Sequence, residues 1–110
     1  MSVGKFAVYW PKSAEIDLIT IIGYIADDNL EAALKTLKKI KDACRSLDSF
    51  PKRCRIVPEL KRFGITVYQE TIVSHYRVQF RIDDNRVWVL GVLDSRRNLG
   101  DILLDRFLES

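Results

Sequence analysis

Residues 74–97, SHYRVQFRIDDNRVWVLGVLDSRR, determine the fold more than any other stretch of the chain. Polar and apolar residues alternate over 74–82, which predicts a strand with one polar and one apolar face. Asp-Asp-Asn at 83–85 favours a tight turn, because these residue types tolerate a left-handed backbone. The run 87–93 is apolar on both faces, as expected for a buried central strand. The stretch therefore predicts an antiparallel hairpin.

Four arginines lie on or next to this hairpin. Arg77 and Arg81 fall on the polar face of the first strand, while Arg96 and Arg97 follow the end of the second. We expect the first strand to be half-solvated, with its arginines on an open sheet surface. Cations held on a rigid sheet imply a polyanionic or carboxylate-rich partner.

The first half of the chain predicts a strand followed by two helices. Lys5–Trp10 alternates like a short strand, and Ser13 is a candidate N-cap for a helix over about 14–27. Asn29 is a candidate N-cap for a second helix, which Pro51 ends. Both helices carry an apolar stripe at three- and four-residue spacing. The short connection predicts an antiparallel helix hairpin.

The remaining segments complete an α+β fold in a single domain, 1–110. Residues 53–58 and 64–70 are weaker strand candidates, and Pro58 confines the former to a sheet edge. Residues 99–108 have apolar residues at helical spacing, which predicts a short C-terminal helix. We expect the N-terminal strand and the helix hairpin to pack on one face of an antiparallel sheet.

Composition excludes several classes of protein. A chain of 110 residues that is 47% apolar and 30% charged forms one domain with a modest core. It has no apolar stretch near the ~20 residues of a membrane span, and no signal-peptide pattern, so we expect a cytoplasmic protein without a membrane partner. Two cysteines and one histidine do not provide a zinc site. We expect reduced thiols, no metal and no cofactor.

Charge is distributed unevenly along the chain. Residues 1–50 hold seven basic and seven acidic residues, whereas 51–82 hold seven basic and two acidic residues, a local charge of +5. This asymmetry predicts a binding surface for nucleic acid or for an acidic protein. The basic residues concerned are Lys52, Arg53, Arg55, Lys61, Arg62, Arg77 and Arg81.

The order of these features resembles the RelE/ParE superfamily of type II toxin–antitoxin toxins. The matching pieces are the helix hairpin, Arg55-Ile-Val-Pro-Glu59, Tyr76-Arg77-Val78, Val87-Trp-Val-Leu and the Arg96-Arg97 pair. The resemblance covers nearly the whole chain. It implies a growth inhibitor that is neutralised by a small cognate antitoxin in a hetero-oligomer. It also implies one of two targets, DNA gyrase for ParE-like members or ribosome-bound messenger RNA for RelE-like endoribonucleases.

The ribonuclease alternative assigns roles to particular residues. The resemblance implies that Arg77 would hold the scissile phosphate and that Arg96 or Arg97 would be the second arginine. Attack by a 2′-hydroxyl also requires a base and an acid, which arginines do not supply. Glu59 and His75 are the candidates for proton transfer.

Each of these residues also has a structural interpretation. Arg77 could form a salt bridge with Glu70, Glu59 could pair with Lys61 or Arg62, and His75 could be an exposed polar neighbour on the sheet. RelE-like toxins often carry a Tyr or His shortly after the second arginine, but this chain continues with Asn-Leu-Gly-Asp-Ile at 98–102. That departure favours the ParE-like alternative, a growth inhibitor directed at gyrase.

Overall fold

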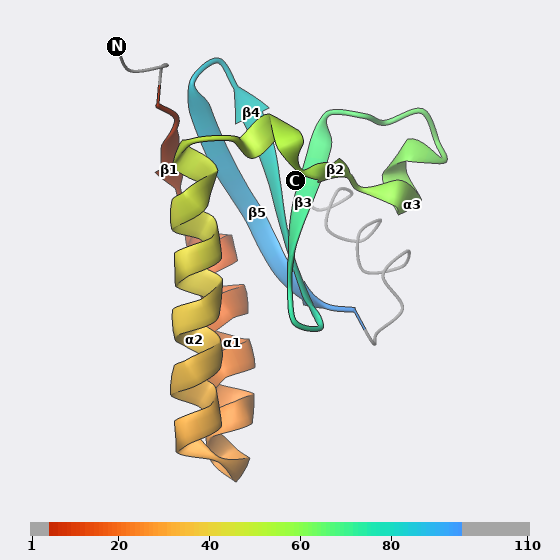
Figure 1. Cartoon of the computed structure of the whole chain (residues 1–110). Helices are drawn as coiled ribbons and strands as arrows, with labels where there is room; N and C mark the ends of the chain where they lie inside the picture. Colours follow the sequence, from red (N-terminus) through yellow and green to blue (C-terminus); the bar gives the residue numbers. More distant parts are fainter. Residues whose placement is uncertain (1–4, 96–110) are drawn as a thin grey trace.

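The computed structural model describes residues 5–95, which form two layers, a helix hairpin and a five-stranded sheet (Figure 1). The predicted C-terminal helix, Arg96 and Arg97 lie outside the described residues. In chain order the elements are β1 (Ala7–Tyr9), α1 (Lys12–Asp28), α2 (Leu30–Arg45), the 3₁₀ turns η1 (Ser46–Asp48) and η2 (Pro51–Arg53), β2 (Arg55–Ile56), α3 (Pro58–Lys61), β3 (Tyr68–Val73), β4 (Tyr76–Asp83) and β5 (Arg86–Asp94).

The strand order in the sheet is β1-β5-β4-β3-β2. β3, β4 and β5 form the antiparallel meander that the sequence predicts, and β2 is an edge strand as expected. β1 pairs with β5 in the parallel direction, with Ala7 opposite Arg86, so the sheet is mixed rather than wholly antiparallel. No tight turn joins β1 to β5, and a long connection leaves the pairing direction free.

Two tight turns bound β4. Asp84 has a φ of 55°, which confirms the left-handed hairpin turn predicted at Asp-Asp-Asn. Ser74 has a φ of 59° and forms the β3–β4 turn together with His75. β4 therefore begins at Tyr76, two residues later than the alternation predicts.

One of the two predicted helix caps is confirmed. The amide of Ala32 donates a hydrogen bond of 3.0 Å to Oδ1 of Asn29, which caps α2. The predicted cap at Ser13 is wrong, because α1 begins at Lys12 and the carbonyl of Pro11 accepts from the first-turn amides. Proline supplies a fixed φ there, so no side-chain cap is needed to start the helix.

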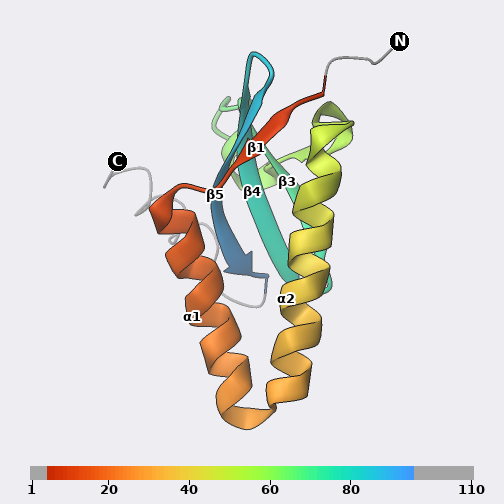
Figure 2. The ribbon, with the colours of Figure 1, turned by 90° about the vertical axis from the view of Figure 1, so that its left-hand side faces the viewer.

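The core lies between the helix hairpin and one face of the sheet (Figure 2). Its buried members are Ala14, Leu18, Ile40, Cys44, Val73, Tyr76, Val78, Val89 and Val92. Burial raises the pKa of the Cys44 thiol to about 12, so this cysteine is protonated and unreactive at neutral pH. Among residues 5–95, no helix is both long enough and apolar enough to cross a membrane.

Candidate functional site

The face of β4 that points away from the helices contains a buried polar cluster. Alternation along β4 places Arg77 and Gln79 on this face, as the sequence predicts, but each is only 4% exposed. Glu70, opposite Gln79 on β3, is 1% exposed. The expectation of an open, half-solvated surface around Arg77 is therefore wrong. Strand periodicity assigns a side chain to a face but does not say what covers that face.

Arg77 is held by two carboxylates from different elements. Its Nε and Nη2 donate to Glu70 at 2.7 and 2.8 Å, and its Nη1 and Nη2 donate to Glu59 at 2.8 and 2.7 Å. Each carboxylate is therefore bound through both of its oxygens, the strongest geometry for an arginine ion pair. The salt bridge between Arg77 and Glu70, one of the two sequence interpretations of Arg77, is confirmed.

Arg55 and Gln79 complete the cluster around Glu70. Nε of Arg55 donates to Oε2 of Glu70 at 2.6 Å, and Nε2 of Gln79 donates to Oε1 of the same carboxylate at 3.2 Å. Two guanidinium groups thus face two carboxylates, and the net charge of the cluster is zero. Buried ionic groups need such pairing, because an unpaired charge is costly to desolvate. The cluster joins α3, β2, β3 and β4.

Both partners of the Arg77–Glu59 pair are stabilised in their charged forms. The hydrogen bond from Arg77 lowers the pKa of Glu59 below its usual range, and the same pair raises the pKa of Arg77. Glu59 pairs with Arg77 rather than with Lys61 or Arg62, so that sequence interpretation is wrong. A carboxylate that is engaged through both oxygens and has a lowered pKa is a weak general base.

This shift predicts an acid-dependent loss of stability. Because the pKa of Glu59 is lower in the folded than in the unfolded protein, its contribution is complete above the unfolded value, near 4.5. It disappears as the pH falls through the folded value. Glu59→Gln should therefore flatten the decline of the melting temperature below about pH 4.5. If the melting temperature of Glu59→Gln fell with pH as steeply as that of the wild type, the contribution of the Glu59–Arg77 pair would be contradicted.

His75 lies apart from this cluster. It sits in the β3–β4 turn, its ring centroid is 4.2 Å from that of Tyr76, and it lines a cavity of about 740 Å³ beside α1 and α2. Its Nε2 is buried and has no hydrogen-bond partner within residues 5–95. The interpretation of His75 as an exposed polar neighbour on the sheet is wrong, because the residue lies in the turn and its Nε2 is buried. The structure does not bring together Glu59 and His75 as an acid–base pair.

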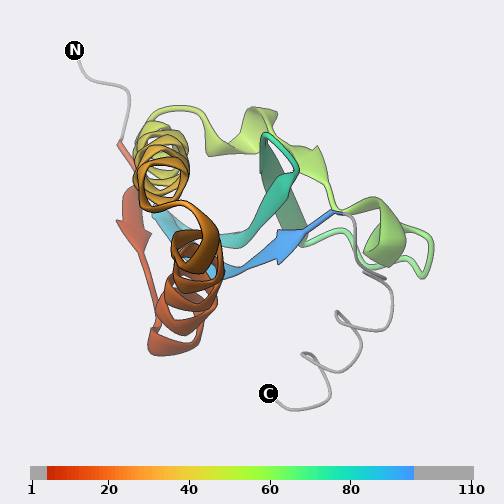
Figure 3. The ribbon, with the colours of Figure 1, turned by 90° about the horizontal axis from the view of Figure 1, so that it is seen from below.

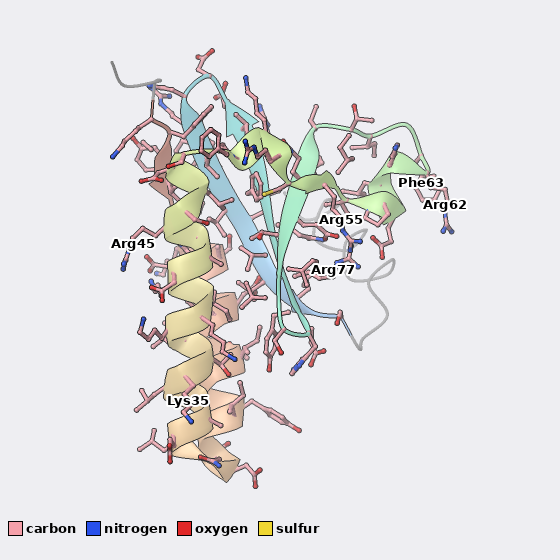
Figure 4. All side chains as sticks on the ribbon, viewed as in Figure 1. Lys35, Arg45, Arg55, Arg62, Phe63 and Arg77 are labelled. Carbon is pink, nitrogen blue, oxygen red and sulfur yellow. The ribbon has the colours of Figure 1, made fainter. Side chains whose placement is uncertain are left out.

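The other basic residues lie mostly on the β2 side of the sheet, which carries Arg55 and Arg62 in Figure 4. Lys52 and Arg53 lie on η2, with the Arg53 guanidinium 4.4 Å from the Phe50 ring. Lys61 and Arg62 follow on α3 and at its end, and both are exposed. Arg81, also exposed, lies near the end of β4. A role of these residues in binding nucleic acid or antitoxin stays a prediction.

The sequence analysis did not predict a group of exposed apolar side chains next to Lys61 and Arg62. A strand was expected from Gly64, but β3 begins at Tyr68 and Gly64 has a φ of 80°. Phe63, Ile65 and Val67 therefore lie in an exposed loop rather than in the sheet. The glycine within the run KRFGITV at 61–67 was the available signal, since it indicates a turn.

Comparison with known proteins agrees with this architecture. The chain has the fold of the RelE/ParE superfamily of toxins. It resembles the structure of the chromosomal ParDE toxin–antitoxin system from P. aeruginosa, with a TM-score of 0.67 and 17% identity over 84% of this chain and 98% of that chain. It also resembles the RelBE2 toxin–antitoxin complex from Mycobacterium tuberculosis, with a TM-score of 0.50 and 22% identity over 82% of this chain and 98% of that chain.

A family assignment follows from the sequence itself. Residues 8–99 match the model of the family described as the ParE toxin of the type II toxin–antitoxin system parDE. A search of curated protein sequences found no match. Because the family model covers most of the chain, this protein belongs to the ParE toxin family of type II toxin–antitoxin systems.

Proposed function

We propose that this toxin is a ParE-like growth inhibitor that acts on DNA gyrase in the cytoplasm and does not cleave RNA. The observation that carries the proposal is the state of Arg77. All three of its nitrogens donate to carboxylates, and its side chain is only 5% exposed. The sheet arginine that the ribonuclease alternative needs is thus already engaged by Glu59 and Glu70.

Phosphate binding at this position would be unfavourable for electrostatic reasons. A guanidinium stabilises a phosphate when its donors are free to point at the anion. Here a phosphate would have to displace a carboxylate and would then lie beside two negative charges, those of Glu59 and Glu70. Within residues 5–95, neither proton-transfer candidate is poised for a reaction at Arg77, because Glu59 is ion-paired and His75 lines the cavity beside α1 and α2 instead.

The similarity to known proteins also favours a ParE-like toxin. The matching family is named for the ParE toxin, and the ParDE system has the higher TM-score of the two structures. Both of those structures contain toxin–antitoxin systems, which supports a small cognate antitoxin as the partner of this chain. Basic side chains on η2 and β2 favour an acidic antitoxin.

The proposal predicts a particular growth phenotype. Induced expression should produce filamentation and a DNA-damage response while protein synthesis continues, because a gyrase inhibitor damages DNA before it affects translation. The measurement is a time course of amino-acid incorporation and of a DNA-damage reporter in the same culture. Co-expression of the adjacent small reading frame is the control and should restore growth. An arrest of translation before the reporter rises would contradict the proposal.

A further inference from the structure

Residues 61–67, the last residue of α3 and the loop that follows it, form an exposed segment that we call the α3 loop. Every residue of this segment is exposed, and its large apolar side chains Phe63, Val67 and Ile65 are 70%, 58% and 39% exposed. Figures 3 and 4 place α3 on the opposite side of the sheet from the helix hairpin, with Arg62 and Phe63 at its outer end. The loop therefore presents an apolar surface far from the helices that make the main core.

The loop is preorganised by its backbone. The amide of Ile65 donates to the carbonyl oxygen of Leu60 at 3.0 Å. The amide of Gly64 donates to the carbonyl oxygen of Lys61 at 2.9 Å. These two bonds, with Gly64 at a φ of 80°, are those of a Schellman turn. A loop that is already ordered loses little conformational entropy when it binds a partner.

The base of the loop is fixed to the rest of the protein. Leu60 is 3% exposed and packs with Val57, Leu93 and Tyr68. One residue earlier, Glu59 forms its ion pair with Arg77 of β4. α3 is thus attached to the sheet through an apolar and an ionic contact, and both lie within four residues of Phe63. This rigid base holds Phe63 and its neighbours in a defined direction.

The chemistry of the loop indicates an acidic protein partner. Lys61 and Arg62 directly precede Phe63 on the same exposed segment, and Arg55 lies on β2. The acidic residue of α3, Glu59, is already neutralised by Arg77. A single-stranded nucleic acid would bind cations and stack on an aromatic ring. The aliphatic side chains beside Phe63 favour instead an apolar protein pocket with an acidic rim.

We propose that the α3 loop is the element through which this toxin docks on its target protein. Phe63 enters an apolar pocket, Lys61 and Arg62 face carboxylates on its rim, and the Arg77–Glu59 pair positions the loop. The identity of the target rests on the function proposed above. The docking role of the loop is an addition to that function.

Phe63→Ala tests the anchor directly. The matched control is Tyr24→Ala, since Tyr24 is an aromatic residue that is 82% exposed near the end of α1. With purified DNA gyrase as the probe, Phe63→Ala should weaken binding by about 10- to 100-fold, as expected for a central aromatic anchor. Both variants should keep the wild-type melting temperature and bind antitoxin normally, and Tyr24→Ala should keep wild-type affinity for gyrase.

The outcomes separate this inference from the proposed function. If the wild-type chain fails to bind gyrase, the proposed function is wrong, and docking on gyrase through the loop is wrong with it. If the wild type binds and Phe63→Ala binds equally well, only the loop proposal is overturned. An equal loss in both variants, or a loss of antitoxin binding alone in Phe63→Ala, would also overturn it.

Charge reversal tests the rim. Arg62→Glu should lower the association rate with gyrase about tenfold at low salt, because electrostatic steering acts mainly on encounter. The difference from wild type should shrink as ionic strength rises. Binding to a single-stranded RNA oligonucleotide that Phe63→Ala and Arg62→Glu abolish, with gyrase binding intact, would overturn the proposal in favour of a nucleic-acid site.

Discussion

Replacement of Arg77 by alanine should lower the melting temperature by more than about 10 °C. The substitution leaves two carboxylates, Glu59 and the 0% exposed Glu70, with only Arg55 to balance their charge. Breaking a buried ion pair from one side typically costs about 3–5 kcal/mol. In a domain of this size each kcal/mol corresponds to roughly 4–8 °C. Thermal unfolding followed by circular dichroism measures the effect.

Three further variants locate the cause of this loss. Arg81→Ala, at an exposed position four residues along the same strand, should stay within about 0.5 kcal/mol of the wild type. Arg77→Met combined with Glu70→Gln should be more stable than Arg77→Met alone, because the second change removes the stranded charge. If Arg77→Ala melts within a few degrees of the wild type, as a solvated surface arginine would, the buried network is not what stabilises this face.

The stability effect changes how toxicity data should be interpreted. An Arg77 variant that loses growth inhibition has also lost the contacts that join α3 to β4. Its inactivity would therefore reflect unfolding as readily as a lost catalytic group. Variants of exposed residues that keep the wild-type melting temperature, such as Phe63→Ala, are the informative ones for function.

Addition of the cognate antitoxin should raise the melting temperature of the toxin by about 10 °C or more. We expect binding in the nanomolar range or tighter, which corresponds to about 12 kcal/mol. A ligand at 100 to 1,000 times its dissociation constant stabilises the folded state by about 2.7–4.1 kcal/mol. The exposed basic residues Lys52 and Arg53 offer an acidic partner favourable contacts without further desolvation of buried charges.

The experiment uses the product of the small reading frame adjacent to the toxin gene. Co-expression and pull-down establish the complex, and a titration then follows the melting temperature against antitoxin concentration. The increase should grow with the logarithm of that concentration once the sites are saturated. A melting temperature that stays constant over the titration would contradict a tight toxin–antitoxin pair.

Local patterns predicted the framework of this fold. Alternation and the turn residues at 83–85 gave the hairpin of β4 and β5, and Asn29 gave the start of α2. These features depend on residues that are neighbours in the sequence, so composition and spacing are sufficient. The parallel pairing of β1 with β5 depends on contacts between distant segments, and spacing alone does not encode them.

The candidate site also depends on contacts between segments that are distant in the sequence. Glu59 lies 18 residues before Arg77, and the two meet only because α3 packs beside the meander. The sequence indicated that Arg77 would face away from the helices and could pair with Glu70, which is correct, but not that Glu59 of α3 would also bind it. The sequence did not indicate the exposure of the segment around Phe63 for a related reason. A strand that began at Gly64 would have placed Ile65 and Val67 in the sheet, whereas Gly64 forms a turn.

One paired assay distinguishes a toxin that acts on gyrase from one that cuts RNA. The purified chain is added to DNA gyrase with relaxed plasmid and, in parallel, to translating ribosomes carrying a defined messenger RNA. We expect supercoiling to be inhibited at near-stoichiometric toxin while the messenger RNA stays intact. Cleavage of the ribosome-bound messenger RNA, with supercoiling unaffected, would contradict it.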